Sequence, residues 1–240
     1  NQNKNYAKNF GQIFRSSGIF FIPKDVKTTI SLSNYWKFKN GINVGIVVSE
    51  RHLNGRLAAR REMHFTGAVM NISDFSIPEG SVEIEAFSSV NLQVPYAAIM
   101  VIYETGSSVS MVHSYGRNHS LIELESNNAI TAVREVGWTI RATIASSESF
   151  AVFHNGHVGC AAQTGALILT NADNEETWIE FEIDALRPFE TKIFSMLEIY
   201  PEYRDFFAGK DGWAAMHFDH DSALSRMLLC TTDQDRVELQ

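Results

Sequence analysis

The segment from Thr164 to Met196 constrains the fold more than any other part of the chain. It contains an apolar run at 166–169, a break at 171–173, and apolar residues alternating with glutamates over 179–183. Such period-two alternation is typical of a strand with one buried and one solvated face. A third extended run follows Pro188. Strands spaced this closely predict an all-β protein.

The same succession of segments occurs earlier in the chain, which indicates an internal duplication. A Thr-Gly-Ala start, an alternating run and a run that contains proline follow one another in both places. The aligned residues are 66–74 with 164–173, 81–87 with 178–184, and 92–99 with 186–193. Alternating strands resemble one another in any case, and this is the alternative explanation. We therefore predict two tandem, related β-sandwich-like units.

The predicted organisation has three parts. They are an N-terminal extension and hairpin at 1–56 that packs on the first unit, the first β-sandwich unit at 57–156, and the second at 157–240. The hairpin rests on aromatic and polar residues that alternate up to Asn40-Gly41, a pair that favours a type I′ turn. One short helix is predicted at 197–207, where Pro201 can occupy the first turn.

Charge and hydropathy exclude two classes of protein. The 240 residues include 28 acidic and 20 basic ones, which gives a formal net charge of -8. A nucleic-acid-binding protein normally needs a basic face to displace counterions, so this balance argues against nucleic acid as a partner. No apolar run approaches the length of a membrane span. We therefore expect a protein without a membrane span.

Cysteine usage and the first residues bear on the compartment. Cys160 and Cys230 could pair, but their number and spacing do not indicate a disulfide scaffold, and we predict two separate core thiols in a reducing compartment. No charged region followed by an apolar region opens the chain. A cytoplasmic location is expected, and a signal peptide removed before Asn1 is the alternative.

One family resemblance supports the expected fold. The Thr-Gly-Ala start at Thr164, the run WIEFEI from Trp178, the segment 186–193 and the extended segment 147–154 together resemble the small soluble transducers of microbial sensory rhodopsins. That resemblance implies a β-sandwich that assembles as an oligomer and is not an enzyme. No functional residue is carried over through it, and residues 1–56 have no counterpart in it.

The first candidate ligand site lies at His113, Tyr115 and Arg117. On one strand these residues would alternate onto a single face, where a guanidinium beside a phenol and an imidazole suits a carboxylate, a phosphate or a sugar. An exposed strand face commonly carries the same residue types without a ligand. Both interpretations stay open.

A second candidate ligand site is the turn His154-Asn155-Gly156-His157. It follows an apolar strand, and loops at strand ends are where sandwiches commonly carry function. The alternative is an ordinary Asn-Gly turn with two exposed imidazoles. Tyr35, Trp36 and Phe38 could likewise form a platform for sugars, but a buried strand explains Trp36 and Phe38 more simply.

The candidate metal site is His217, Asp219 and Asp221. These three side chains would share one face of a strand, with His220 on the other, and could bind a divalent ion. A solvated turn rich in Asp and His explains the same residues, and no His-Glu-x-x-His helix strengthens the metal hypothesis.

Function is predicted from the fold and from the missing catalytic motifs. The chain has no Gly-x-Ser-x-Gly elbow and no phosphate-binding loop, which favours a non-enzyme. We expect a binding or assembly module that recognises a glycan or a protein, forms a homo-oligomer and needs no cofactor. One rival is a metal-assisted hydrolase or lyase acting on an anionic carbohydrate, with His217, Asp219, His113 and Arg117. Another is a structural subunit of a viral or surface assembly, because sandwiches support all of these functions.

Overall fold

The computed structural model describes residues 14–88, 98–106, 108–115, 117–120, 131–143, 147–220, 225–233 and 236–239. Across this part of the chain the structure consists of four antiparallel sheets and three short helices. The prediction of an all-β fold is therefore confirmed. None of the described helices is long and apolar enough to cross a membrane.

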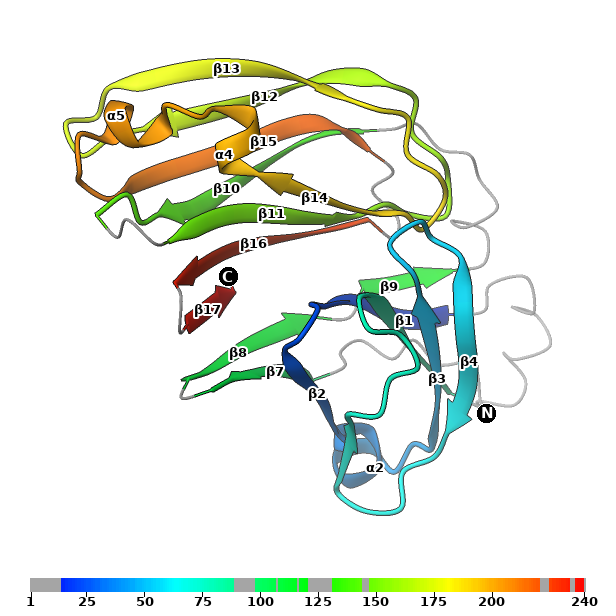
Figure 1. Ribbon diagram of the computed structural model, residues 1–240. Helices are drawn as coiled ribbons and strands as arrows, with labels where there is room; N and C mark the ends of the chain where they lie inside the picture. The colour runs from blue at the N-terminus through cyan, green and yellow to red at the C-terminus, as the bar shows by residue number, and fades with distance from the viewer. Residues whose placement is uncertain are drawn as a thin grey trace. The chain divides into compact units, whose positions relative to one another are not determined.

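The chain divides into two compact units. The first comprises Asn1–Tyr103 and Met111–Ala129, and the second comprises Glu104–Ser110 and Ile130–Gln240. Figure 1 shows each as a set of strands in two sheets. Apolar residues of both sheets lie inside each unit, so each is a β-sandwich.

The first unit is built from a five-stranded and a four-stranded sheet. The five-stranded order is β4 (Leu57–Met63), β3 (Val44–Arg51), β6 (Gly80–Ser88), β1 (Phe14–Ile22), β9 (Arg117–Ser120). The four-stranded order is β5 (Val69–Ile72), β2 (Lys27–Ser33), β7 (Ala98–Thr105), β8 (Ser108–Tyr115). The Tyr103 hydroxyl on β7 donates to the Phe21 carbonyl on β1 at 2.8 Å, which ties the two sheets together.

The second unit has two four-stranded sheets. One has the order β10 (Thr131–Ile140), β15 (Gly212–His220), β12 (Gln163–Thr170), β13 (Glu176–Ile183). The other has the order β14 (Thr191–Ser195), β11 (Glu148–His154), β16 (Arg226–Asp233), β17 (Arg236–Leu239). Leu167 and Met216 from the first sheet pack with Phe153 and Phe194 from the second.

Two short helices complete the core of the second unit. They are α4 (Met196–Ile199) and α5 (Tyr203–Phe207), and both contribute buried side chains to it. A single helix was predicted at 197–207, but Pro201 lies in a turn between these two. Since proline has no N–H to donate, the helical hydrogen bonding stops there.

The two units share one strand order. Read along the chain, the first eight strands β1 to β8 correspond one by one to β10 to β17. The sheet order β4-β3-β6-β1 then matches β13-β12-β15-β10, and β5-β2-β7-β8 matches β14-β11-β16-β17. This shared topology fits the prediction of two tandem, related units, with β9 as an addition to the first.

The predicted residue alignment between the units is nevertheless wrong. It matched β6 with β13, but β6 lies in the middle of its sheet and pairs with β1 and β3. Among the described strands, β13 is at an edge and pairs with β12 alone. The topological partner of β13 is β4. The alternation of apolar and polar residues shows which side chains share a face of a strand, but it does not show where the strand lies in its sheet. In the third predicted alignment, residues 92–97 lie outside the described part of the chain.

The predicted domain boundaries also need correction. Strands β10 and β11 were assigned to the first unit at 57–156, but β10 pairs with β15, and β11 pairs with β14 and β16. Both therefore belong to the second unit. Strands β1 to β3 are parts of the two sheets of the first unit and do not form an extension.

The predicted N-terminal hairpin is a helix. Residues Tyr35–Asn40 form α2, which ends at Gly41 with φ 66°. A left-handed glycine terminates a helix as readily as it forms a type I′ turn, which is why Asn40-Gly41 misled the prediction. Trp36 is buried with its ring 6.4 Å from that of Phe65, whereas Phe38 is 70% exposed.

Both cysteines are buried and free, as predicted. Cys160 and Cys230 lie in the second unit, and burial raises the pKa of the Cys230 thiol.

Candidate functional site

The structure separates the first predicted ligand group. His113 and Tyr115 lie on β8, whereas Arg117 lies on β9, which pairs with β1 in the other sheet of the first unit. The chain changes sheet between Tyr115 and Arg117, so the three residues do not alternate along one strand. The expected common face is therefore wrong.

The second predicted ligand group is largely internal. His154 is 2% exposed, its Nδ1 lies 2.9 Å from Thr191 Oγ1, and burial lowers its pKa to about 3. Asn155 is fully buried, and its Nδ2 donates to the carbonyls of Val158 at 2.9 Å and Arg187 at 2.8 Å. His157 is half-buried. These contacts hold the segment after β11 in place, so the alternative interpretation, an ordinary turn with two exposed imidazoles, is wrong.

Two of the three predicted metal ligands share a face, as expected. His217 and Asp219 point outward from β15, while His220 is buried and its ring lies 5.1 Å from that of Phe153. Asp221 lies outside the described residues. Within the described ranges, no three His, Cys, Asp or Glu side chains are placed to hold a metal ion.

His217 and Asp219 belong to a larger surface, the outer face of the β10-β15-β12-β13 sheet. Alternate residues of these strands, such as Leu167, Phe181 and Met216, point inward and pack in or against the core. Their neighbours must point to the opposite face. On three strands these outward residues are Trp178, Glu180 and Glu182; Thr164, Ala166, Ile168 and Thr170; and Trp213, Ala215, His217 and Asp219. We call this surface the outer face.

A small residue at the centre of the outer face leaves a hollow. Ala166 stands opposite Glu180 on one side and His217 on the other. Because its methyl group is short, the longer side chains on both sides border an open depression of about 200 Å³. Its lining includes Gln163, Thr164, Glu180, His217, Phe218 and Asp219. The hollow therefore offers carboxylates, an imidazole, an amide and a hydroxyl.

Gln163 fixes one end of the hollow. Its side-chain amide accepts a hydrogen bond from the Asp219 N–H at 2.8 Å and donates one to the Asp219 carbonyl at 2.7 Å. At the opposite edge, Thr164 Oγ1 donates to Glu182 at 3.2 Å. These bonds hold β12 in register with both neighbours where the hollow opens.

Two exposed tryptophans lie on the same face. Trp178 is 62% exposed and Trp213 is 56% exposed, whereas Trp36 and Trp138 are each 1% exposed. Trp178 stands opposite Ile168 and Trp213 opposite Thr170. They are therefore two strands and two residues apart, with Cα atoms on the order of 12 Å from each other.

Close packing below the outer face positions these side chains. A Cβ atom on Gly165 would come within 2.8 Å of Ile183, and one on Gly212 within 2.2 Å of Phe207. Glycine at position 165 therefore leaves room for the Ile183 side chain to cover β12 on the core side, and glycine at position 212 lets the Phe207 ring of α5 pack directly beneath the start of β15. Trp213 follows Gly212 immediately, so this contact sets its position.

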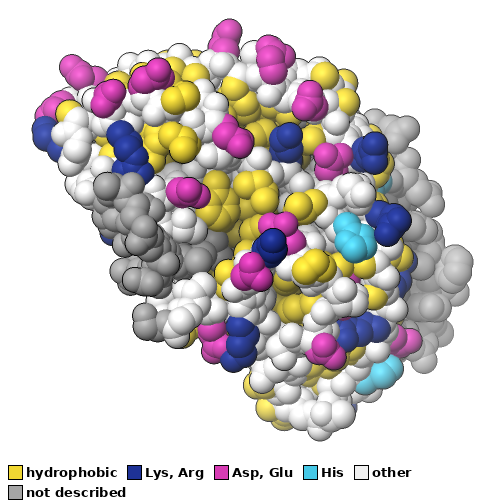
Figure 2. Space-filling view, viewed as in Figure 1, with side chains coloured by type: hydrophobic (Ala, Val, Ile, Leu, Met, Phe, Trp, Pro, Cys, Tyr) yellow, Lys and Arg dark blue, Asp and Glu magenta, His cyan; other side chains and the backbone are white. Residues whose placement is uncertain are grey.

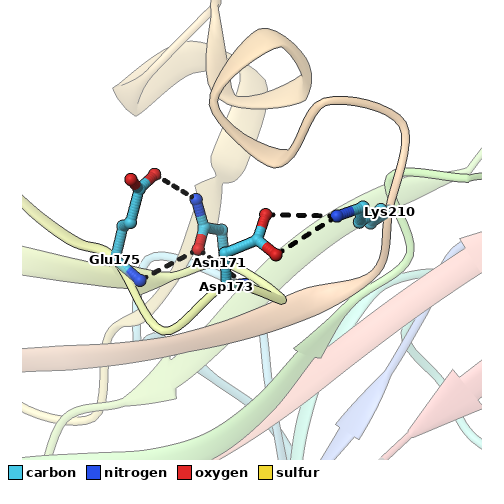
Figure 3. Close-up of polar contacts among 4 residues, drawn as sticks. All are labelled: Asn171, Asp173, Glu175 and Lys210. Carbon is cyan, nitrogen blue, oxygen red and sulfur yellow. Dashed lines mark hydrogen bonds and ion pairs between the residues drawn. The ribbon is translucent and has the colours of Figure 1, made fainter.

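The β12–β13 turn closes one end of the outer face. Asn171 Oδ1 accepts hydrogen bonds from the N–H groups of Asp173 at 3.0 Å and Glu175 at 2.9 Å. Its Nδ2 donates to the Glu175 carboxylate at 2.9 Å, and Lys210 pairs with Asp173 at 3.1 Å (Figure 3). The turn is thereby fixed to the segment that leads into Trp213.

The outer face is acidic as well as aromatic. Glu176, Glu180, Glu182 and Asp219 are all exposed, and in the part of the chain that the structure describes none of them forms an ion pair. The outer face thus presents negative charge beside the indole rings of Trp178 and Trp213. Figure 2 shows the other side of the second unit, which carries α4 and α5 in Figure 1, and acidic and hydrophobic side chains are interspersed there as well.

Sequence reasoning found half of this surface. His217 and Asp219 were singled out, but Trp178, Trp213 and Glu180 were missed. The signal was present, because Trp178 is in phase with the glutamates of its strand and Trp213 is in phase with His217.

No family model, curated protein or solved structure matches this chain. The resemblance to the rhodopsin transducers and the cytoplasmic location therefore stay predictions.

Proposed function

We propose that this protein is a non-enzymatic glycan-binding module whose ligand lies across the outer face of the second unit. The observation that carries the proposal is the pair of exposed tryptophans, Trp178 and Trp213, on one rigid sheet face beside a polar hollow. Each side chain of this arrangement has a counterpart in the chemistry of a sugar chain.

The indole rings supply the apolar part of the site. A large exposed apolar side chain is informative when it lies in a patch, because such patches mark binding surfaces. The flat C–H face of a pyranose stacks on an indole ring, and the indole N–H remains available for a hydrogen bond. Two indole side chains whose Cα atoms lie on the order of 12 Å apart suit a chain of sugars better than a single one.

The hollow supplies the polar part. Sugar hydroxyl groups donate well to carboxylates, and hydrogen bonds with one charged partner are stronger than neutral ones. Glu180 and Asp219 can accept such bonds, while Gln163 and Thr164 keep the strands beneath them in register. A few fixed polar groups beside apolar surface is the usual composition of a small-molecule site.

A glycan suits this face better than a protein partner does. The core of a protein–protein interface is depleted of charged residues. Here the carboxylates of Glu180 and Glu182 stand on the same strand face as Trp178. Burying them against a protein would require desolvation of both, whereas a glycan leaves much of its site in water.

The test is a glycan array followed by calorimetric titration of the strongest hit. Trp178→Ala and Trp213→Ala should each weaken the affinity for this glycan at least about tenfold. Phe38→Ala is the matched control, because Phe38 is an exposed aromatic residue of the first unit. Binding that is equal in all variants, or absent from the array, would contradict the proposal.

We also propose that the protein acts as a homo-oligomer. Single glycan sites on open surfaces bind weakly, and several linked copies raise the effective affinity without any new contact. Native mass spectrometry should show more than one copy per particle, and a strict monomer at working concentration would contradict this.

A further inference from the structure

We infer that the outer face selects its ligand by charge, taking glycans that carry free amino groups in preference to neutral ones and rejecting uronates. This inference rests on the proposed function, and it specifies the chemical class of the ligand. It follows from the sign of the charges around the hollow and the tryptophans.

The acidic groups form a band along the face. Glu176, Glu180 and Glu182 succeed one another on the outward side of β13, and Asp219 lies across the sheet on β15. Two of them, Glu180 and Asp219, line the hollow itself. Within the described residues none of the four has a cationic partner, so their charges act on whatever lies above them.

Among the side chains that the structure describes, none that lines the hollow is a lysine or an arginine. Lys210, at the end of the face, is paired with Asp173 at 3.1 Å. A ligand carboxylate over Ala166 would therefore meet acidic groups first, and a ligand ammonium would meet complementary ones.

The tryptophans reinforce this preference. A cation over an indole face is attracted by the negative face of the ring, and tryptophan is the best aromatic partner for it. An amino sugar places its ammonium group beside the same C–H face that stacks on the ring. One ligand can therefore satisfy Trp178 and the adjacent carboxylate of Glu180 together, since both point outward from β13.

The experiment compares three hexasaccharides of equal length, made of glucosamine, N-acetylglucosamine and galacturonate, by calorimetry at a pH that keeps the amines protonated. We expect the glucosamine hexamer to bind at least about fivefold more tightly than the N-acetylated one at low salt. The galacturonate hexamer should not bind. The preference should shrink at about 0.5 M salt, because exposed charges are screened there.

Variants assign the preference to the carboxylates. The doubly substituted chain E180Q/D219N should lose the preference for glucosamine and retain binding to N-acetylglucosamine. Glu198→Gln is the matched control, since Glu198 is an exposed acid on α4. The Glu198→Gln variant should prefer the glucosamine hexamer over the N-acetylglucosamine hexamer as strongly as the unsubstituted chain does.

The outcomes separate this inference from the proposed function. If the N-acetylated or the galacturonate hexamer binds as well as the glucosamine hexamer, and Trp178→Ala weakens it, the charge selection is wrong while glycan binding stands. If none of the three hexamers binds, and no other glycan does, both are overturned.

Discussion

The β4-β3-β6-β1 sheet of the first unit and the β13-β12-β15-β10 sheet of the second have corresponding strands in the same order. The side chains on their outward faces nevertheless differ in polarity and in exposure. In the first unit, the outward residues of β3 and β6 include Ser49, Arg51, Glu83 and Glu85, and all four are buried. In the second unit, the corresponding strands β12 and β15 carry the hollow and the exposed Trp213. One face is polar and closed, and the other is aromatic and open.

The polar groups of the first face interact with one another. Ser17 Oγ donates to Glu83 at 3.1 Å, Arg51 lies 3.9 Å from the same carboxylate, and Arg60 Nε donates to Ser49 Oγ at 2.9 Å. Burial raises the pKa of Glu83, and the neighbouring charge of Glu85 adds to this effect. Such charges contribute to folding because each has a partner inside the unit.

The comparison teaches that the fold does not decide where function lies. A sheet face whose charges have internal partners is part of the folded structure, whereas a face with exposed indoles and with carboxylates that form no ion pair among the described residues has interactions left to make. Substitutions on the first face should therefore change stability, and substitutions on the second face should change binding.

The largest effect is expected from breaking the first face. Arg51→Ala removes the cation that is paired with the buried Glu83 carboxylate, which should lower the free energy of unfolding by about 3 kcal/mol. Urea unfolding measures this change. The double substitution R51M/E83L removes both charges and should recover most of the loss. A single variant as stable as the original chain would remove the distinction between the two faces.

Acid should destabilise the second unit through its interior and not through its outer face. The pKa of His154 in the folded protein is about 3 against an ordinary 6.5, so only the unfolded chain takes up this proton as the pH falls through that window. The contribution of neutral His154 to the free energy of unfolding is therefore fully present above pH 6.5 and decreases as the pH falls toward 3. At about pH 5 it is smaller by about 2 kcal/mol. His154→Gln should flatten this dependence in urea unfolding.

His217→Gln is the control for this measurement, because His217 lies on the outer face. It should leave the acid dependence unchanged. If His217→Gln flattens the curve and His154→Gln does not, the outer face is coupled to folding and the comparison fails.

The tryptophans of the outer face should matter for the ligand alone. Trp178→Ala and Trp213→Ala are each expected to weaken glycan binding about tenfold, which equals about 1.4 kcal/mol. Their free energies of unfolding should change by less than about 0.5 kcal/mol, since exposed positions seldom affect stability. Calorimetric titration and urea unfolding of the same samples measure both, and a large loss of stability would place these rings in the fold.

The smallest effects concern the turn at the end of the outer face. Asn171→Ala removes three hydrogen bonds of the β12–β13 turn and should cost about 1 kcal/mol. Lys210→Met removes an exposed ion pair and should change stability by less than about 0.5 kcal/mol. Thermal unfolding ranks the two variants, and the reverse order would mean that the ion pair fixes the turn.

The sequence predicted the kind of structure better than its arrangement. The alternation at 179–183 identified β13 and its two faces correctly, because local periodicity follows from strand geometry. At Tyr35–Asn40 the same kind of alternation occurs in a helix, where Trp36 and Phe38 point to different sides. Six residues are too few for periodicity to separate the two structures.

The candidate site was only partly predictable for a related reason. Glu83 and Glu180 both sit in alternating runs and both appear solvent-facing from the sequence. Glu83 is buried and Glu180 exposed, and this difference depends on long-range packing that local pattern does not encode. The equivalence of β6 with β15 likewise depends on pairing between distant strands.

Tryptophan fluorescence tests the central claim most directly. Of the four tryptophans, Trp178 and Trp213 are exposed, while Trp36 and Trp138 are buried. Acrylamide should quench only the exposed pair in the free protein, and a saturating glycan should protect that pair from the quencher. Quenching that stays unchanged while a glycan is bound would show that the ligand lies elsewhere and would contradict the account.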